Sequence, residues 1–429
     1  MRIAVFSDNF YPELSGIADS ILNLAEQLAA RGHCIRFYAP RYAAKDYALL
    51  GLPIAEIHPT DTIGVVRLPS IPYPTGTTQG RMVFPTGLRW RGLRGFQPDV
   101  IHVHLPFGVG LEGLMAARAL GTPLVGTNHT PMTEFLRYAP IQAAWCERLG
   151  ARYTAWFYGH CNFVSSPSET IFAEMEHYCF RVRHRVISNP VRLDAFYPLP
   201  QRQLLKAKFG FSDFTILYAG RLAPEKRVDL LVRAVAGLVS EVPAVRLALL
   251  GRGSAEADLK SLCQSLRVAE RMSFLGFLPN STAVAEAYNA ADVFAIASTA
   301  ETQSIAAMQA MACGLPVVGV RAWGLGEYIN ETNGLLVNPG DGQALRQALA
   351  YLAVHPQARA QLGQGGQQFV TRFSAPAIAA EWEEIYQAVA NDFQHRRSAN
   401  GFSPGRDCHT KDIPFRGADP RPSHRPGVG

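Results

Sequence analysis

The feature that most constrains the fold is an alternation of short apolar runs with amphipathic segments, starting at the first residues. RIAVFSD (residues 2–8) has the unbroken apolar character of a buried strand, and GIADSILNLAEQLAARG after it repeats apolar residues at helical spacing. Further apolar runs are CIRFYAP, DVIHVH, PLVGTNH and CNFVSSPS, each ending in polar or small residues. Buried strands that alternate with helices predict a mostly parallel sheet with both faces covered.

The alternation restarts after a proline-rich stretch around residues 186–203. FTILYAGR, VRLALLGRG, RMSFLGF, VFAIAS and PVVGV are again candidate strands, separated by helical segments. At 429 residues the chain is long enough for two cores. We therefore predict an α/β fold of two doubly wound, Rossmann-like domains, residues 1–195 and 196–374, that face an inter-domain cleft. A last helix, predicted at 375–393, has no strand after it and packs back on either domain.

Composition limits the classes of function. The Pro/Gly-rich, aperiodic segment 394–429 predicts a disordered tail, and its seven Lys/Arg and three Asp supply +4 of the net charge of +6. The remainder is too weakly charged to favour nucleic-acid binding. The seven cysteines are odd in number and never spaced as C-x-x-C, which favours a reducing compartment over disulfides or a zinc ribbon. Because no secretory signal or membrane span is visible, we expect a cytoplasmic protein.

Polar residues that follow strands are the candidates for a binding site, because ligands of open α/β sheets bind beyond the carboxyl ends of the strands. In the second half, Arg221 directly follows a strand and Lys226 precedes a helix. A guanidinium and an ammonium at this place suit a diphosphate, and ordinary surface charge is the alternative. Gly251 and Gly253 follow the next strand, where the backbone can approach a ligand closely. They do not complete a G-x-G-x-x-G fingerprint, since Glu256 replaces the last glycine.

The stretch ETQSIAAMQAMACGLPVV (301–318) begins with an acid ahead of a helix predicted to start near Gln303. The free amides of a helix N-terminus attract anions. Glu301 would repel a phosphate bound there, so its carboxylate fits better beside the hydroxyl groups of a neutral neighbouring moiety. The alternative is an acid that only favours the helix dipole.

The first half places three further candidates at strand ends. Gly16 lies in the first strand–helix loop, and His104 and His129 end successive strands. An imidazole at a strand tip can bind sugar hydroxyls or relay a proton, whereas a single histidine is more often structural.

Taken in order, these segments resemble glycosyltransferase family 4, whose members are retaining enzymes with the GT-B fold. The matching pieces are FYPELSGIADSI, HVHLPFGVG, GTNHT, VSSPS, SNPVRLDAF, YAGRLAPEKRVDLL, LLGRGS, LGFLP, ETQSIAAMQAMACGLPVVG and NGLLVNPGD. They lie in order over residues 1–345, and the tail matches nothing. The resemblance implies transfer of a hexose from a UDP- or GDP-linked sugar, with retention at the anomeric carbon.

The resemblance also implies roles for single residues. Arg221 and Lys226 would hold the diphosphate and neutralise the leaving group, while Glu301 would bind the hydroxyls of the donor sugar. His104 would contact that sugar near the reacting centre and complete the catalytic set, and His129 would lie near the acceptor. The other donor contacts implied are Gly16 and Gly251 in loops, Phe277 and Leu278 facing the base, and Ser304 and Ile305 through their backbone N–H groups.

One departure concerns the ribose contact. The family usually carries a second Glu eight residues after the first, and here that position is Gln309. An amide still accepts from a hydroxyl but loses charge assistance, which costs about 1 to 2 kcal/mol of donor binding. The chain has no D-x-D, so neither a metal ion nor another cofactor is expected, and cations and helix amides would stabilise the leaving group. We expect a front-face route in which the departing phosphate accepts the acceptor's proton.

The acceptor is indicated by a basic, aromatic segment, RMVFPTGLRWRGLRGF (81–96). It gathers Arg81, Arg89, Arg91 and Arg94 around Trp90 and could rest on an anionic bilayer, the alternative being a solvated basic face. Arg89 and Arg91 are therefore candidate acceptor-side residues.

HLPFGVG and NHTPMTEFLRY resemble family members that glycosylate diacylglycerol or phosphatidylinositol. This favours a lipid acceptor and a peripheral position on the inner face of the cell membrane. A polysaccharide or soluble sugar acceptor is an alternative, and so is a catalytically silent sugar-nucleotide-binding protein, which only Gln309 supports. An NAD-dependent dehydrogenase is disfavoured, because SDNFYPELSG lacks the glycine fingerprint.

Overall fold

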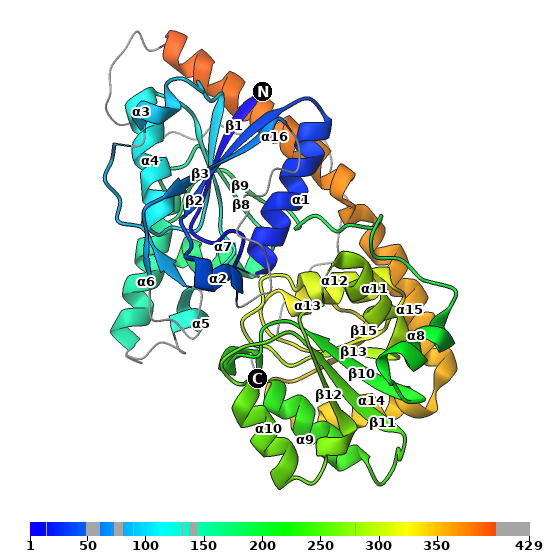
Figure 1. Cartoon of the computed structure of the whole chain (residues 1–429). Helices are drawn as coiled ribbons and strands as arrows, with labels where there is room; N and C mark the ends of the chain where they lie inside the picture. Colours follow the sequence, from blue (N-terminus) through cyan, green and yellow to red (C-terminus); the bar gives the residue numbers. More distant parts are fainter. Residues whose placement is uncertain are drawn as a thin grey trace. The chain divides into compact units, whose positions relative to one another are not determined.

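The computed structural model describes residues 1–13, 15–48, 61–72, 80–88, 90–130, 132–136, 144–278 and 280–399 (Figure 1). Residues Met1–Ala390 form one compact unit and Asn391–Gly429 a second. Both sheets and every site residue discussed below belong to the first unit.

The first sheet has seven parallel strands in the order β3-β2-β1-β6-β7-β8-β9. Its strands are β1 (Arg2–Ser7), β2 (Cys34–Pro40), β3 (Ile63–Leu68), β6 (Val100–His104), β7 (Leu124–Thr127), β8 (Phe163–Ser166) and β9 (His184–Val186). A separate antiparallel pair joins β4 (Ile71–Pro72) to β5 (Arg81–Met82). The central strands β1, β6, β7 and β8 are almost wholly buried, which agrees with their mostly apolar and small residues.

Helices cover both faces of this sheet. One face carries α1 (Gly16–Ala30) and α16 (Ala375–Ala399), and the other α3 (Trp90–Leu93), α4 (Gly108–Leu120), α6 (Ala144–Tyr158) and α7 (Glu169–His177) (Figure 1). Two short helices, α2 (Ala44–Ala48) and α5 (Met132–Leu136), complete the set. In α1, residues Ile21, Leu24, Ala25 and Leu28 point into the core, as their spacing predicts.

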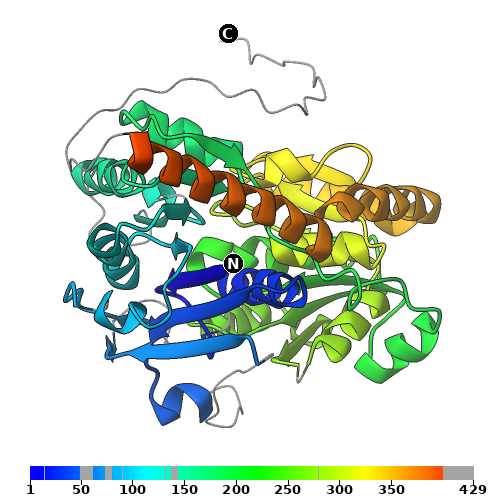
Figure 2. The same cartoon turned by 90° about the horizontal axis from the view of Figure 1, so that it is seen from above.

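The last helix, α16, packs on the first sheet. Ile378, Trp382, Ile385 and Val389 recur at helical spacing and lie in the same core as residues of β1 and α1. Figure 2 shows this orange-to-red helix lying beside α1. Arg31, which follows α1, donates to the Glu383 carboxylate and adds a polar contact at the edge of the core.

The second sheet has six parallel strands in the order β12-β11-β10-β13-β14-β15. They are β10 (Phe214–Ala219), β11 (Val245–Leu250), β12 (Met272–Gly276), β13 (Val293–Ile296), β14 (Val317–Val320) and β15 (Gly334–Val337). The helices here are α8 (Arg202–Phe209), α9 (Val228–Leu238), α10 (Glu256–Ser265), α11 (Ser281–Ala290), α12 (Ile305–Ala312), α13 (Leu325–Tyr328), α14 (Gly342–Val354) and α15 (Pro356–Val370), with 3₁₀ turns at Pro224–Lys226, Ala269–Arg271 and Thr371–Phe373.

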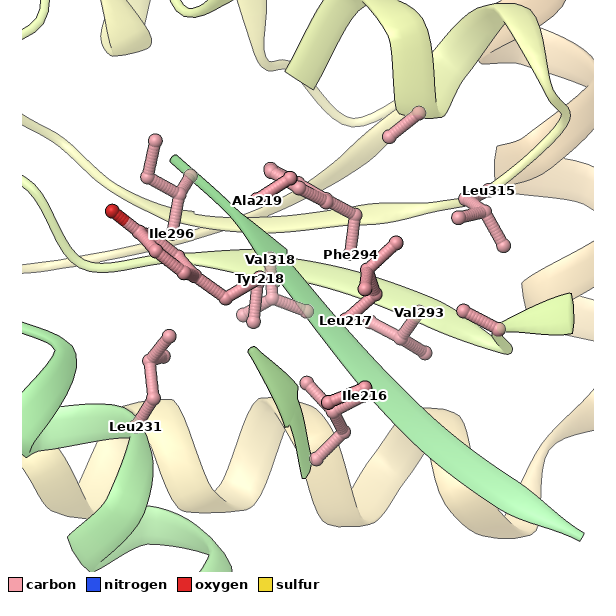
Figure 3. Packing of buried hydrophobic residues seen from close by; sticks show 14 of the residues in the cluster. Ile216, Leu217, Tyr218, Ala219, Leu231, Val293, Phe294, Ile296, Leu315 and Val318 are labelled. Carbon is pink, nitrogen blue, oxygen red and sulfur yellow. The ribbon is translucent and has the colours of Figure 1, made fainter. Parts of the chain in front are cut away.

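The core of the second sheet is built on β10. Ile216 and Leu217 are fully buried, and the register pairs them with Val293 and Phe294 of β13 (Figure 3). Continuous burial of these strands explains why their sequences are apolar without alternation.

The order of strands fixes where a ligand can bind. In each sheet the direction of winding reverses, between β1 and β6 in the first and between β10 and β13 in the second. Loops that leave the carboxyl ends of these strand pairs diverge and leave a crevice. The predicted α/β architecture of two parallel sheets is thus confirmed. Among the described residues, no helix is both long and apolar enough to span a bilayer.

Candidate active site

Three glycines shape the carboxyl edge of the second sheet. Gly220 and Gly251 directly follow β10 and β11, and Gly276 ends β12; their φ angles are 148°, 133° and 65°. The Gly251 N–H donates to the Gly276 carbonyl at 2.8 Å, and a Cβ at Gly251 would lie 2.0 Å from the Gly220 carbonyl oxygen. Close backbone contact therefore requires glycine at position 251, independently of any ligand. Its predicted contact with the nucleotide sugar stays a prediction.

The two predicted phosphate-binding cations lie at this edge, and each contacts a carboxylate. The Lys226 ammonium donates to Glu301 Oε1 at 2.6 Å. The Arg221 guanidinium donates to Glu225 Oε1 at 2.8 Å. Lys226 and Glu301 belong to loops that follow β10 and β13, the strands on either side of the winding reversal. The sequence placed both residues at strand ends but gave no sign that they pair.

Glu301 is charged despite its burial. Burial alone would raise its pKa, but the attraction of Lys226 and a hydrogen bond from it outweigh burial, so the pKa lies below the ordinary value. The nearby Arg221 guanidinium acts in the same direction. A buried carboxylate in this state offers strong hydrogen-bond acceptors to hydroxyl groups.

The helix after Glu301 is capped by a different residue. The helix α12 begins at Ile305 rather than near Gln303, and Ser304 Oγ accepts from the Ala307 N–H at 3.2 Å. Since Ser304 caps the helix and Lys226 holds the Glu301 side chain, the acid is not the capping group of this helix.

Gly16 and Ile305 bring two helix N-termini together. Gly16 is the first residue of α1, whose N-cap Ser15 accepts from the Ala18 N–H at 3.1 Å. A Cβ at Gly16 would lie 3.4 Å from Cδ1 of Ile305, the first residue of α12. Helix N-termini carry unpaired N–H groups and partial positive charge, so the convergence suits an anion.

The remaining donor-side candidates surround the same edge. Gln309 lies on α12, and its Oε1 accepts from the buried Tyr288 hydroxyl at 3.2 Å. Phe277 follows β12, is 36% exposed, and has the Arg252 guanidinium 6.0 Å from its ring centroid. Leu278 packs on the core of the second sheet. An exposed ring beside the strand ends can stack on a flat ligand group.

The two predicted histidines contact each other. His104 Nδ1 lies 3.0 Å from His129 Nε2, and the side chains are buried on the face that carries α1 and α16. Burial lowers the pKa of His104 well below its usual value and that of His129 to about 4, so both imidazoles are neutral at pH 7. The His102 ring contacts His104 in a tilted arrangement, with ring centroids 4.0 Å apart. Contact of either predicted histidine with a sugar stays a prediction.

Contacts that the sequence did not predict tie the loop of Glu301 to the first sheet. The Thr302 hydroxyl donates to the His129 carbonyl at 3.1 Å. Gln303 Oε1 accepts from the Asn189 N–H at 2.7 Å, and its Nε2 donates to Ser188 Oγ at 2.6 Å. Ser188 and Asn189 both belong to the segment SNPVRLDAF. The resemblance of that segment to the family was the sequence feature that could have indicated these contacts.

A second such contact comes from α13. The Glu327 carboxylate accepts from Ser168 Oγ at 2.7 Å and from the backbone N–H groups of Glu169 and Thr170 at 2.9 and 3.1 Å. The Tyr328 hydroxyl donates to the Pro167 carbonyl. An acid from the second half of the chain thus caps α7 in the first half.

Glu13 is a further, partly buried acid beside the site. It lies in the loop between β1 and α1, where it accepts from the Tyr42 hydroxyl at 3.0 Å and from Asn9 Nδ2 at 3.1 Å. Burial raises its pKa to about 7, although the Tyr42 hydrogen bond and the charge of Arg221 act against this rise. The predicted segment PELSG contains this acid, but nothing in its sequence indicates the burial.

Contact of the two predicted acceptor-side arginines with an acceptor stays a prediction. Arg89 lies outside the described residues, and Arg91 is an exposed residue of the short helix α3. The described part of the chain contains no cluster of three or more His, Cys, Asp or Glu arranged to hold a metal ion.

Comparison with known proteins identifies the family. The Glycosyltransferase Family 4 model matches residues 14–195, and the Glycosyl transferases group 1 model matches residues 201–369. GDP-mannose-dependent alpha-mannosyltransferase of Mycobacterium tuberculosis is 31% identical over 399 residues, 91% of this chain and 97% of that protein. Alpha-monoglucosyldiacylglycerol synthase of Acholeplasma laidlawii is 27% identical over 407 residues, 90% of this chain and 96% of that protein. Phosphatidyl-myo-inositol mannosyltransferase of Mycobacterium leprae is 27% identical over 405 residues, with 91% and 97% covered.

Solved structures show the same fold. Sucrose-phosphate synthase from Thermosynechococcus elongatus superposes with a TM-score of 0.75 at 22% identity, covering 91% of this chain and all of that one. HepE from Anabaena in complex with UDP-glucose gives a TM-score of 0.71 at 21% identity, with 90% and 100% covered. The chain therefore belongs to glycosyltransferase family 4 and is a glycosyltransferase with the GT-B fold.

Proposed function

We propose that this glycosyltransferase moves a hexose from a UDP- or GDP-linked sugar to a membrane lipid, such as diacylglycerol or phosphatidylinositol, with retention at the anomeric carbon. The observation that carries the proposal is the convergence of two helix N-termini, at Gly16 and Ile305, beside the Lys226–Glu301 pair. Amide N–H groups and cations suit a diphosphate, and a charged buried carboxylate next to them suits sugar hydroxyls.

The diphosphate is the leaving group in this proposal. The bond between the anomeric carbon and the phosphate oxygen breaks, and the acceptor oxygen bonds to the same face of that carbon. The acceptor's proton passes to the departing phosphate oxygen, which balances the step without a protein base. Arg221, Lys226 and the N-termini of α1 and α12 stabilise the negative charge that develops on the phosphate. No metal ion is assigned to this role.

Glu301 has the role of orienting the donor sugar. Its carboxylate is charged at pH 7 because Lys226 holds the pKa below its usual value. Gln309 of α12 accepts a hydrogen bond from the Tyr288 hydroxyl of α11, and Gln309 is the candidate partner for the ribose. Neutral His104 and His129 can exchange hydrogen bonds with sugar hydroxyls but hold no proton to donate as imidazolium ions.

The lipid acceptor rests on the relatives. Two of them are named for diacylglycerol and phosphatidyl-myo-inositol acceptors, and the chain spans nearly the whole length of both. A lipid acceptor places the enzyme at a membrane surface, and we propose the inner face of the cell membrane.

Transfer assays test this function. UDP-glucose, UDP-galactose or GDP-mannose labelled in the hexose is incubated with diacylglycerol or phosphatidylinositol dispersed in detergent. We expect labelled glycolipid from one donor, and loss of at least a hundredfold in rate in Glu301→Gln, the order reported for removal of one transition-state hydrogen-bonding group. Glu270→Gln is the matched control, because that acid is 81% exposed.

Two outcomes would favour the alternatives. A thermal shift with UDP or GDP but no donor consumption across lipid, polysaccharide and soluble sugar acceptors would indicate a silent binder. Nucleotide release that depends on a soluble sugar or polysaccharide instead of lipid would replace the acceptor and leave the transferase.

A further inference from the structure

The outward side of α6 carries large apolar side chains. Trp145, Leu149 and Trp156 are 62%, 60% and 50% exposed. Their spacing of four and seven residues places them on one side of the helix. On the opposite side, Ala155 and Tyr158 are buried in the core against the first sheet. The three side chains therefore face away from the sheet. Trp156 stacks on Tyr153 with ring centroids 5.7 Å apart and is still 50% exposed, so among the described residues the core does not account for the large apolar surface of the three.

Basic residues share this side of the helix. Arg148 and Arg152 are exposed and lie between the two tryptophans in the sequence. The acid of α6, Glu147, is half-buried. The exposed stripe is therefore apolar and positively charged along its length.

Exposed aromatic residues continue the stripe beyond the helix. The Tyr153 hydroxyl donates to the Pro106 carbonyl at 2.5 Å, which places Phe107, 41% exposed, next to α6. Gly108, the residue after Phe107, packs against the backbone of Val83, because a Cβ at Gly108 would meet the Val83 carbonyl oxygen. The next residue, Phe84, is 60% exposed and therefore lies near Phe107 in the fold. We call the seven residues of this surface the α6 face: Phe84, Phe107, Trp145, Arg148, Leu149, Arg152 and Trp156.

The α6 face starts at the edge of the sheet that carries the active site. The helix α6 precedes the parallel strand β8 and so runs from the carboxyl edge of the sheet back to its amino edge. Trp145 is thus near the carboxyl edge, where His104 and the loop after β1 also lie. Pro106, the residue that Tyr153 contacts, is two positions after His104.

We propose that the α6 face docks on a bilayer that contains anionic lipids. This inference rests on the lipid acceptor of the proposed function and names the part of the chain that meets the membrane. Tryptophan favours the boundary between lipid and water, and arginine favours an anionic surface. A bilayer accepts all seven side chains without a complementary shape, whereas a protein partner would need acids opposite the arginines and pockets for five apolar groups.

Vesicle binding without donor or turnover tests the docking. The full chain is sedimented with vesicles of phosphatidylcholine and with vesicles that also contain phosphatidylglycerol. We expect binding to the anionic vesicles only, weakened by added salt. The variant Arg148→Gln/Arg152→Gln should bind about thirty-fold more weakly, since each arginine contributes about fivefold at such a surface. Trp145→Ser/Trp156→Ser should also lose binding.

The control variant is Leu204→Ser, which removes an apolar side chain that is 68% exposed on α8. It should bind like the unaltered protein, and all variants should melt at similar temperatures because the replaced groups are exposed. Equal binding by the α6 variants and the control, or no binding to anionic vesicles at all, would overturn the proposal. So would a dimer in light scattering that the α6 variants dissociate, because the face would then be an interface between copies.

The docking and the proposed function fail in different ways. If docking is correct, the α6 variants lose transfer to acceptor lipid in vesicles but keep transfer to the same lipid dispersed in detergent. Unchanged transfer in vesicles refutes the docking and leaves the function intact. If no lipid is glycosylated in either form while the vesicles are still bound through α6, the lipid acceptor is wrong and the docking stands.

Discussion

Replacing Lys226 with methionine isolates the ion pair on which the site depends. The Lys226 ammonium and Glu301 carboxylate are 2.6 Å apart, and their side chains are 17% and 14% exposed. At an effective dielectric constant near 20, two charges at this distance attract by about 6 kcal/mol. Desolvation offsets part of this, so we expect Lys226→Met to lower the free energy of unfolding by about 3 to 5 kcal/mol at pH 7, since it leaves a buried charge without its partner.

The loss of stability caused by Lys226→Met should depend on pH, because it depends on the charge of Glu301. In the unaltered protein the pKa of Glu301 is below its unfolded value, so its contribution to stability is present above that value and is lost as pH falls through the folded pKa. Without Lys226, burial dominates and the pKa of Glu301 rises above its unfolded value. The destabilisation by Lys226→Met should therefore be largest at pH 7 and shrink toward pH 5.

Chemical denaturation at both pH values measures this difference. Lys208→Met is the matched control, because Lys208 contacts Glu286 at 2.5 Å but its side chain is 55% exposed, and an exposed pair contributes under about 1 kcal/mol. The double variant Lys226→Met/Glu301→Gln should recover much of the loss, since no buried charge remains. The reasoning is refuted if Lys226→Met costs no more than Lys208→Met, or costs the same at both pH values.

Four further predictions follow from the geometry. Gly251→Ala should cost about 2 to 4 kcal/mol by denaturation, because its φ is 133° and its Cβ would lie 2.0 Å from a carbonyl oxygen, whereas Gly342→Ala, with no atom within 4 Å of its Cβ, should be neutral. Glu327→Gln should lower stability by about 1 kcal/mol through the lost charge at the start of α7, and an unchanged denaturation midpoint would contradict this. Gln309→Glu should tighten nucleotide binding about five- to tenfold in calorimetry if this residue holds the ribose, and equal affinity would remove it from the site. The folded pKa of His129, about 4, lies below its unfolded value, so its contribution to the unfolding free energy should fall as pH drops from 6.5 toward 4; the unfolding free energy of the unaltered protein should therefore fall relative to that of His129→Gln over this range, and a constant difference would contradict this.

The sequence predicted the interior strands of both sheets and the edge strand β12, and missed the other three edge strands. CIRFYAP predicted β2 to the residue, because a strand buried on both faces is apolar throughout. The edge strands β3, β9 and β15 were not predicted. Each is short or only partly buried, so its sequence lacks a continuous apolar run; β9, for example, is the three residues His184–Val186.

The sequence predicts which edge of the sheet carries the site, but it does not predict which side chains contact each other there. Topology places residues after β10 and β13 at one edge, which is why Arg221, Lys226 and Glu301 could be grouped from the sequence. The partner of each side chain depends on loop conformations that carry no periodic signal. The Lys226–Glu301 pair and the His104–His129 contact therefore appear only in the structure.

The most direct measurement is the anomeric configuration of the glycolipid formed from an α-linked nucleotide sugar, read by NMR from the coupling of its anomeric proton. The account predicts an α-linked glycolipid, formed in amounts equal to the nucleotide released and at least a hundredfold more slowly with Glu301→Gln. A β-linked product, or a protein that binds the nucleotide and never transfers the sugar, would contradict it.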